Sequence, residues 1–299
     1  MPNVLVVYNP FSGNGKMESV HLPKIKALLE KKGLTYQCFE TTLYADFAQQ
    51  LIATIEANKD AQLVVAGGDG TLYQVLNAIH PQYQKPIGFL QIGTGNDFSQ
   101  AVGYPKRLEK QLELALFAEP KKVDLWYCNQ MLFLNGVGIG FDGEVANRVN
   151  ELRQKGQISK PTYWLTILKT LFNFRHFPAN VSWQDENGEE VEFSTPLFMA
   201  TLGNGVAFGG GFKLTPCSSL NDGLVDVCLI RKVSIPQRIW RLLFIPFGKH
   251  TNMSVVKYHQ TQKVTISFSQ NVPAHIDGEP FKASEFKIHR HPFQVNLRY

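Results

Sequence analysis

Several features that mark common protein classes are missing from this sequence of 299 residues. No apolar run approaches the roughly 20 residues that a helix needs to span a bilayer. The start, Met1-Pro2-Asn3 followed by Val4–Tyr8, lacks the basic segment and the long apolar segment of a secretory signal. The four cysteines are far apart and form no Cys-x-x-Cys pair, which indicates free thiols in a reducing compartment. We therefore expect a cytoplasmic protein.

Signatures of nucleic-acid binding are also absent. The net charge of +5 is modest, and the sequence contains neither a Cys/His finger nor an RNA-binding motif. We expect no nucleic-acid partner. A hydrophobic content of 44% and a charged content of 18% are typical of a globular protein, and the length suits two domains.

The first part of the chain, residues 1–125, alternates short apolar runs with helical patterns. Strands are predicted at Val4–Tyr8, Thr35–Phe39, Gln62–Ala66 and Ile87–Gln91, and helices at Val20–Lys32, Ala45–Ala57, Leu72–Ile79 and Leu108–Phe117. This alternation predicts an α/β domain with a parallel sheet covered by helices.

One predicted strand ends in Gly67-Gly68-Asp69-Gly70-Thr71 and continues directly as a helix. Such a junction leaves backbone N–H groups available to a phosphate, and the glycines permit positive φ and close approach of the ligand. The loop is neither a Walker-type loop nor a Gly-x-Gly-x-x-Gly fingerprint. A carboxylate among the glycines suggests nucleotide carrying magnesium, whereas a plain turn with a capping Asp fits the local sequence equally well.

Two other strand ends carry similar loops, at Asn9–Gly15 and Gly93–Phe98. Since ligands bind at the carboxyl ends of parallel strands, the convergence of three such loops favours a binding site.

The second part, residues 126–292, is rich in strands and hairpin signals. Turns are predicted at Asn187-Gly188, Asn221-Asp222-Gly223 and Asp277-Gly278. We expect a mainly antiparallel β-sandwich domain here. The tail 293–299 is predicted to be one more strand, which completes the first domain.

The chain resembles the bacterial diacylglycerol-kinase-like lipid kinases, which are related to sphingosine kinases and more distantly to NAD kinases. The motifs that carry the resemblance lie in the family's order over nearly the whole chain: Asn9–Gly13, Gly67–Thr71, Gly93–Phe98, Gly136–Asp142, Gly209–Gly211, Asn221–Val227 and Ile276–Pro280. The resemblance implies a two-domain kinase that binds ATP in a cleft between an α/β domain and a β-sandwich domain.

For the nucleotide, the resemblance implies that the ATP phosphates lie on Gly67, Gly68, Asp69, Gly70 and Thr71. Asn9, Ser12, Thr94 and Asn96 would complete the pocket. A threonine after the second strand is also expected near ATP. We favour Thr41 over Thr42, although either could instead cap the helix at Ala45–Ala57.

For the chemistry, Asp277 matches the family's general base, and Asp222 matches an aspartate that holds a structural Mg²⁺. Backbone carbonyls of Ser219 and Leu224 would complete that ion site, and a second Mg²⁺ would arrive with ATP near Asp69. Each aspartate has a plainer alternative, because Asp277-Gly278 is a common hairpin turn and Asn221-Asp222-Gly223 can form a turn without an ion.

A lipid acceptor implies peripheral contact with the inner face of the membrane. Two apolar segments with flanking basic residues are candidates, one at residues 231–249 with Arg238, Trp240 and Arg241, the other at residues 160–175 with Trp164 and Phe172. The plainer alternative is that both are amphipathic helices packed on the second domain, which is the more common role of such stripes.

The expected activity is transfer of the γ-phosphoryl group of ATP to a lipid hydroxyl, and diacylglycerol is the expected acceptor. The alternatives are an NAD-kinase-like enzyme that acts on a soluble nucleotide and a non-catalytic regulator that binds lipid or nucleotide. The sequence leaves the oligomeric state open, a homodimer included.

Overall fold

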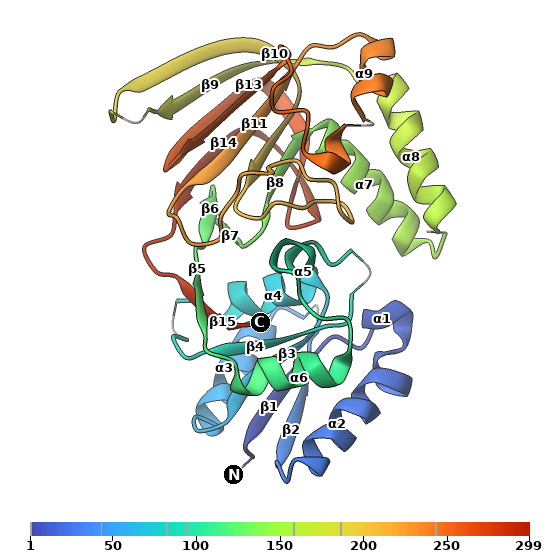
Figure 1. The fold of residues 1–299 in the computed structure, drawn as a ribbon, viewed down its shortest axis with the longest axis vertical. Coiled ribbons are helices and arrows are strands. Elements are labelled where there is room, and N and C mark those ends of the chain that lie inside the picture. Colours follow the sequence, from blue (N-terminus) through green and yellow to red (C-terminus); the bar gives the residue numbers. More distant parts are fainter. Residues whose placement is uncertain are drawn as a thin grey trace. The chain divides into compact units, whose positions relative to one another are not determined.

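The computed structural model describes residues 2–42, 44–81, 83–93, 95–157, 159–185, 187–242 and 244–299. Its contacts divide the chain into two units (Figure 1). The N-terminal unit comprises Met1–Val123 with Phe293–Tyr299, and the C-terminal unit comprises Asp124–Pro292. Each unit is described by itself below.

The N-terminal unit contains a six-stranded sheet in the order β2-β1-β3-β4-β15-β5. Its strands are β1 (Val4–Tyr8), β2 (Tyr36–Glu40), β3 (Gln62–Gly67), β4 (Ile87–Gln91), β5 (Lys121–Val123) and β15 (Val295–Arg298). The first four strands run parallel, and β15 from the chain's end pairs parallel with β4. The predicted parallel α/β sheet is therefore confirmed. Strand β3 is buried almost throughout, as the continuous apolar run Leu63–Ala66 requires.

The helices of this unit follow the strands. They are α1 (Ser12–Gly15), the π-helical turn η1 (Met17–His21), α2 (Leu22–Lys31), α3 (Phe47–Ala57), α4 (Asp69–Ile79), α5 (Asp97–Val102) and α6 (Leu108–Phe117). Helix α4 begins three residues earlier than its apolar pattern suggests, directly after Gly68. The Gly-Gly-Asp-Gly-Thr segment is thus itself the helix start.

The C-terminal unit contains a nine-stranded, antiparallel sheet. Its strands are β6 (Trp126–Cys128), β7 (Met131–Phe133), β8 (Gly136–Gly140), β9 (Phe177–Gln184), β10 (Glu190–Gly203), β11 (Val225–Arg231), β12 (Val256–Thr261), β13 (Lys263–Ile276) and β14 (Glu279–Arg290). The predicted hairpin turns at Asn187-Gly188 and Asp277-Gly278 are confirmed, since they join β9 to β10 and β13 to β14. The turn signal at Asn221-Asp222-Gly223 was wrong as a tight hairpin, because it ends the long connection between β10 and β11.

Strands β8 and β9 share the space between the two long strands β10 and β13. Strand β9 pairs with one half of each long strand and β8 with the other half. Register shifts in β10, between Leu197 and Met199, and in β13, between Ser267 and Val272, lie between these halves. The arrangement brings the turn after β13 next to the start of β8.

Helices α7 (Phe141–Gln154), α8 (Lys160–Asn173) and α9 (Ile235–Leu242) and the 3-10 turn η2 (Ile245–Phe247) belong to this unit. Figure 1 shows α7 and α8 side by side next to the sheet. Their inward side chains, including Phe141, Val145 and Leu171, join Phe198 and Ile230 of the sheet in one apolar cluster. No helix within the described residues is long and apolar enough to cross a bilayer.

Candidate active site

Three strand-end loops of the N-terminal unit meet, as the parallel sheet predicts. The N–H of Asn9, after β1, donates to the carbonyl of Ala66 in β3 at 3.3 Å. The N–H of Ile92, after β4, donates to the carbonyl of Gly67 at 2.7 Å. The segments Asn9–Gly15, Gly68–Thr71 and Gly93–Phe98 therefore follow strands that are tied together at their carboxyl ends.

The glycines of the central loop are needed because neighbouring atoms pack closely against them, and not because of unusual backbone angles. Gly67, Gly68 and Gly70 do not adopt the positive φ that the sequence suggested, and Gly68 is extended at φ −94°. A Cβ on Gly67 would lie 2.4 Å from Oγ1 of Thr71. A Cβ on Gly93 would lie 2.7 Å from the Cα of Gly68. Side chains are excluded here because the backbones of two loops pack directly on each other.

Asp69 links the central loop to the third loop. Its Oδ2 accepts the N–H of Asp97 at 2.8 Å, and its Oδ1 accepts the N–H of Phe98 at 3.3 Å. Burial raises the pKa of Asp69, and the backbone donors oppose that rise. The carboxylate thus satisfies the first N–H groups of α5, a role for which the sequence offered no signal. Its predicted place beside MgATP stays a prediction.

Asn9 and Asn96 shape their loops through the backbone. Oδ1 of Asn9 accepts the N–H of Phe11 at 2.9 Å, and the Asn9 carbonyl accepts the N–H of Ser12. Asn96 has a left-handed backbone at φ 63°, and its Oδ1 is buried with no hydrogen-bond partner among the described residues. A buried amide oxygen of this kind can receive a ligand donor. Thr94, the other predicted contact in this loop, lies outside the described residues.

Thr41 and Thr42 differ in how far their side chains are exposed to solvent. The Thr41 N–H donates to the carbonyl of Tyr8, and the Thr41 side chain is buried, whereas Thr42 is half-buried. Helix α3 begins after Asp46, so the suggestion that either threonine caps this helix is wrong. Which threonine contacts a nucleotide stays a prediction.

In the C-terminal unit, Asp277 occupies the tight turn between β13 and β14 at φ 46°. Its Oδ1 accepts the N–H groups of Asn135 and Gly136, at 2.9 and 2.7 Å, and its Oδ2 accepts the N–H of Leu134 at 2.8 Å. Three backbone donors therefore fix the orientation of the half-buried carboxylate. The plainer alternative, a hairpin turn residue, is confirmed, and it is compatible with a chemical role.

His275 and Asp142 lie directly beside this turn and were missed from the sequence. Nε2 of His275 lies 3.1 Å from Oδ2 of Asp142, and its Nδ1 accepts the N–H of Gly278 at 3.3 Å. Gly138 makes room for the pair, because a Cβ there would lie 2.3 Å from both groups. The signal for this arrangement was the Gly-x-Gly-x-Gly pattern of β8.

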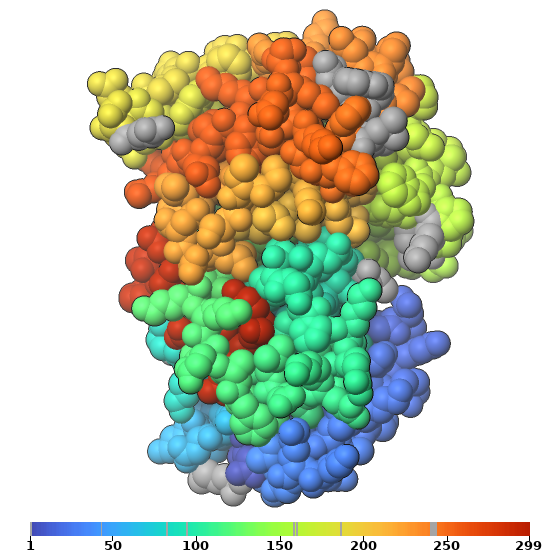
Figure 2. All heavy atoms as spheres, viewed as in Figure 1, coloured from blue at the N-terminus to red at the C-terminus, as the bar shows by residue number. Residues whose placement is uncertain are grey.

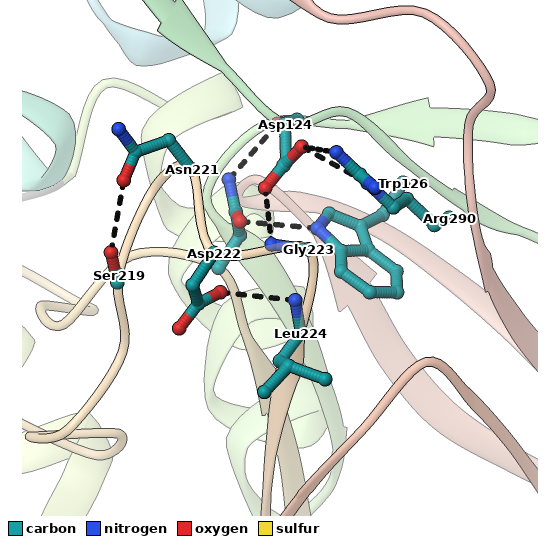
Figure 3. A network of polar contacts seen from close by, with 9 residues as sticks. Asp124, Trp126, Ser219, Asn221, Asp222, Gly223, Leu224 and Arg290 are labelled. Atoms are coloured by element: carbon teal, nitrogen blue, oxygen red, sulfur yellow. Dashed lines mark hydrogen bonds and ion pairs between the residues drawn. The ribbon is translucent and has the colours of Figure 1, made fainter.

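The Asp222 turn is held by a buried network (Figure 3). Asp124 has a fully buried side chain, its Oδ2 accepts the N–H of Gly223 at 2.8 Å, and its Oδ1 accepts from the guanidinium of Arg290. Oδ1 of Asp222 accepts the N–H of Leu224 at 3.0 Å, and Oγ of Ser219 donates to Asn221. The backbone of the turn is therefore held by hydrogen bonds from Asp124 and Asp222.

The donors around Asp222 are chemically suited to Mg²⁺. They are oxygen atoms, and Asp222 is exposed, so water can complete a coordination shell. Burial, with a contribution from the nearby charge of Asp222, raises the pKa of Asp226. No cluster of three or more His, Cys, Asp or Glu side chains that could hold a metal occurs in the described part of the chain. Any ion here would depend on Asp222 and backbone carbonyls.

Comparison with known proteins agrees with this architecture. Residues 3–128 match the family described as the diacylglycerol kinase catalytic domain, and residues 135–298 match the YegS C-terminal NAD kinase beta sandwich-like domain. Similar proteins include a diacylglycerol kinase of Bacillus subtilis, 28% identical over 93% of this chain and 90% of that protein. Another relative, a diacylglycerol kinase of Staphylococcus carnosus, is 29% identical over 92% of this chain and 87% of that protein.

A solved structure described as a diacylglycerol kinase from Bacillus anthracis strain Sterne shares the fold. It aligns with a TM-score of 0.70 at 19% identity and covers 100% of this chain and 97% of its own. Since the two family matches together span nearly all of the sequence, the chain belongs to the diacylglycerol-kinase-like lipid kinase family and is a phosphotransferase.

Proposed function

We propose that the protein transfers the γ-phosphoryl group of ATP to the primary hydroxyl of diacylglycerol, giving phosphatidic acid and ADP. The acceptor is supported by the names of the relatives, diacylglycerol kinases that match over most of their length. ATP as the donor follows from the kinase family. The observation that carries the proposal in this chain is Asp277, a carboxylate fixed by three backbone N–H groups.

The proposed reaction is an in-line displacement. The acceptor hydroxyl oxygen forms a bond to the γ-phosphorus, the bond from that phosphorus to the β–γ bridging oxygen breaks, and ADP leaves. The hydroxyl proton passes to the carboxylate of Asp277, which must lie within hydrogen-bond reach of the acceptor. Fixing the carboxylate beforehand removes part of the ordering cost of the transition state.

The nucleotide site is proposed to consist of the loops that meet at the carboxyl edge of the N-terminal sheet. The backbone N–H groups of Gly68, Asp69 and Gly70 stand at the start of α4, where a helix favours phosphate. Asn9 and Ser12 flank this start through the neighbouring loop, and the Asn96 amide oxygen can accept a hydrogen bond from the ligand. When bound, Mg²⁺ would neutralise phosphate charge near Asp69 and brace the turn at Asp222.

Contact with a bilayer is part of the proposal, because diacylglycerol resides there. Helix α8 has two apolar faces: Ile167 and Leu171 are buried in the core, whereas Trp164, Leu165, Leu168 and Phe172 are 40–49% exposed. The exposed four lie within about one third of the helix circumference. Figure 2 shows α8, in yellow-green, along one edge of the C-terminal unit. Such a stripe is suited to the interface between water and acyl chains.

The other membrane candidate, residues 231–249, needs a correction. Arg238, which the sequence placed among the basic residues that face the membrane, is buried, and its Nη1 donates to the carbonyls of Leu171 and Phe174 at the end of α8. Side chains of Trp240 and Arg241 lie outside the described residues. Charge reversal at Arg238 would therefore disrupt α8 and would not test membrane contact.

The test of the function is an assay with labelled ATP and dispersed diacylglycerol. Labelled phosphatidic acid at a turnover of order 1–100 per second is the expected result. Separate reactions with phosphatidylglycerol, a sphingoid base, a polyprenol and NAD examine the alternatives. Label in NADP would identify a soluble-nucleotide kinase, and the absence of any labelled product would indicate a non-catalytic regulator.

A further inference from the structure

An open hollow of about 510 Å³ lies on the C-terminal unit where α8 ends and α9 begins. The end of α8, the start of β9 and the connection from β11 to α9 line it. Its charged lining is cationic: Arg175, Lys232 and Arg238 contribute, Asn173 and His176 add polar groups, and no Asp or Glu lines it. The volume of the hollow lies within the range of ligand sites, about 300–1,000 Å³.

Arg238 forms the buried side of the hollow. Its side chain is 7% exposed, its guanidinium donates to three backbone carbonyls, and it lies 4.7 Å from the ring centre of Phe198. No ion pair neutralises it among the described residues. Burial lowers the pKa of Arg238, yet arginine stays protonated in proteins. A buried cation without a counter-ion is costly, and an anion in the hollow would offset that cost.

The pKa of His176 reflects its burial and the positive charges around the hollow. Its Nε2 accepts the N–H of Val233 at 3.1 Å, which places the proton of the neutral ring on Nδ1. Burial, together with the charges of Arg238 and Lys232, lowers the pKa of His176. The ring thus remains neutral and leaves the positive charge of the hollow to the Arg and Lys side chains.

The sequence shows why this region is positive. Residues 152–184 contain five Lys or Arg and no Asp or Glu, and residues 227–276 contain seven and none. These two stretches supply α8, α9 and every lining residue of the hollow except Pro196. No carboxylate within either stretch can compensate the cluster.

The rim of the hollow is apolar and continuous with the exposed stripe of α8. Phe172 is 48% exposed and Ile235 is 42% exposed, and both line the hollow. Helices α8 and α9 lie beside each other here (Figure 1), joined through Arg238. A cationic hollow with an apolar rim matches an amphiphile that has a negative head and acyl chains.

We propose that this hollow binds the phosphate group of an anionic phospholipid headgroup, so that the lipid anchors the α8 stripe in the bilayer. Arg175 and Lys232, which are exposed, would donate to the phosphate oxygens, and Arg238 would supply charge from beneath. The inference rests on the proposed membrane contact but needs no catalysis, so it stands or falls separately from the activity.

The experiment measures binding of the full-length protein, without ATP or diacylglycerol, to sedimented vesicles. One set is phosphatidylcholine alone and the other contains about one third phosphatidylglycerol. The variant Arg175→Gln with Lys232→Gln should lose about tenfold or more in binding to the anionic vesicles, given about 1 kcal/mol for each basic residue at such a surface. Neither change removes a buried group, so folding should be retained.

The matched control is Lys263→Gln with Lys282→Gln, two exposed lysines outside the hollow. It removes the same charge, and a loss of less than about threefold is expected. Equal losses in both double variants would show a diffuse charge effect and overturn the site. Calorimetry with inorganic phosphate distinguishes a lipid headgroup from a soluble phosphate. If Arg175→Gln with Lys232→Gln loses the binding of inorganic phosphate but keeps wild-type binding to vesicles, the lipid assignment is overturned in favour of a soluble phosphate.

Discussion

The side chain of Asp277 has two roles. It holds a turn, and in the proposed reaction it accepts the proton of the acceptor hydroxyl. Because both of its oxygens accept backbone N–H groups, the orientation of the carboxylate depends on the strand start at Gly136 and not on packing. A general base that is fixed in this way does not have to be ordered when the acceptor arrives.

Asp277→Asn is expected to lower kcat by about 100-fold or more, because an amide cannot accept the acceptor's proton. It should also cost about 1–2 kcal/mol of stability, since an amide NH₂ cannot replace the oxygen that faces the N–H of Leu134. Turnover with diacylglycerol and urea unfolding measure the two effects.

The control is Asp185→Asn, in the hairpin between β9 and β10. Oδ1 of Asp185 also accepts two backbone N–H groups, those of Asn187 and Glu189, at 2.9 Å each. Because both donors share Oδ1, the amide oxygen of the new asparagine can still accept them, so this variant should lose less than about 1 kcal/mol of stability and keep wild-type turnover. If both variants keep their turnover, Asp277 is a turn residue only.

Gly93→Ala should be strongly destabilising, whereas Gly95→Ala should be tolerated. The new Cβ at 93 would lie 2.7 Å from the backbone of Gly68, which cannot give way without separating two loops. At 95 the Cβ meets only Oδ2 of Asp69, at 3.8 Å. We expect a loss of about 1–3 kcal/mol or more at 93 and below about 1 kcal/mol at 95. Thermal unfolding of both purified variants gives the comparison, and equal losses would contradict the close approach.

At the scale of elements, β12 carries a half-buried histidine, His259, that should make stability depend on pH. Both ring nitrogens of His259 are buried with no hydrogen-bond partner among the described residues, and the ring lies 4.3 Å from that of Trp183. Burial, aided by the charge of Lys257, lowers the pKa of His259 to about 4. The folded ring therefore stays neutral where an unfolded histidine, with its pKa near 6.5, takes up a proton.

Stability should accordingly fall as the pH drops from about 6.5 toward 4, because the unfolded state binds the extra proton. The shift from this one group is worth at most about 3 kcal/mol. Urea unfolding at pH 7 and pH 5 should show a smaller decrease for His259→Phe than for the wild type. An unchanged decrease would assign the acid sensitivity to other buried groups, such as His250.

The elements of the N-terminal unit could be predicted because apolar periodicity and glycine stops mark them clearly. The strands of the C-terminal unit were harder to predict from the sequence. Strands β10 and β13 are 14 residues long each, but register shifts and polar residues such as those at 269–271 interrupt their alternation. Strands β6 and β7 have three residues each, too few for a periodic signal.

Sequence motifs indicated the loops of the candidate site but not the contacts inside them. The reach of Asp69 to the start of α5, and of Asp124 to the turn at Gly223, spans 28 and 99 residues along the chain. Arg238 shows the same limit, because a basic residue in an amphipathic pattern looks exposed until its carbonyl partners are known. Such pairings depend on tertiary packing, which local patterns do not encode.

At the scale of the whole molecule, the net charge of +5 is unevenly distributed along the chain. Two acid-free stretches hold twelve of the thirty Lys and Arg residues, so the remainder of the chain is net acidic. Binding to anionic vesicles should therefore weaken as NaCl rises from about 50 to 500 mM, since screening shortens the range of this field. Sedimentation at each salt concentration gives the slope, and binding independent of salt would point to apolar contact alone.

The most direct test of the central claim is a competition experiment. Wild-type protein receives labelled ATP together with equal amounts of diacylglycerol, phosphatidylglycerol, a sphingoid base and NAD, and the products are separated. The proposed function predicts that most of the label appears in phosphatidic acid, with one ADP formed for each phosphatidic acid and both products lost in Asp277→Asn. Label mainly in another product, or phosphatidic acid formed equally well by Asp277→Asn, would contradict it.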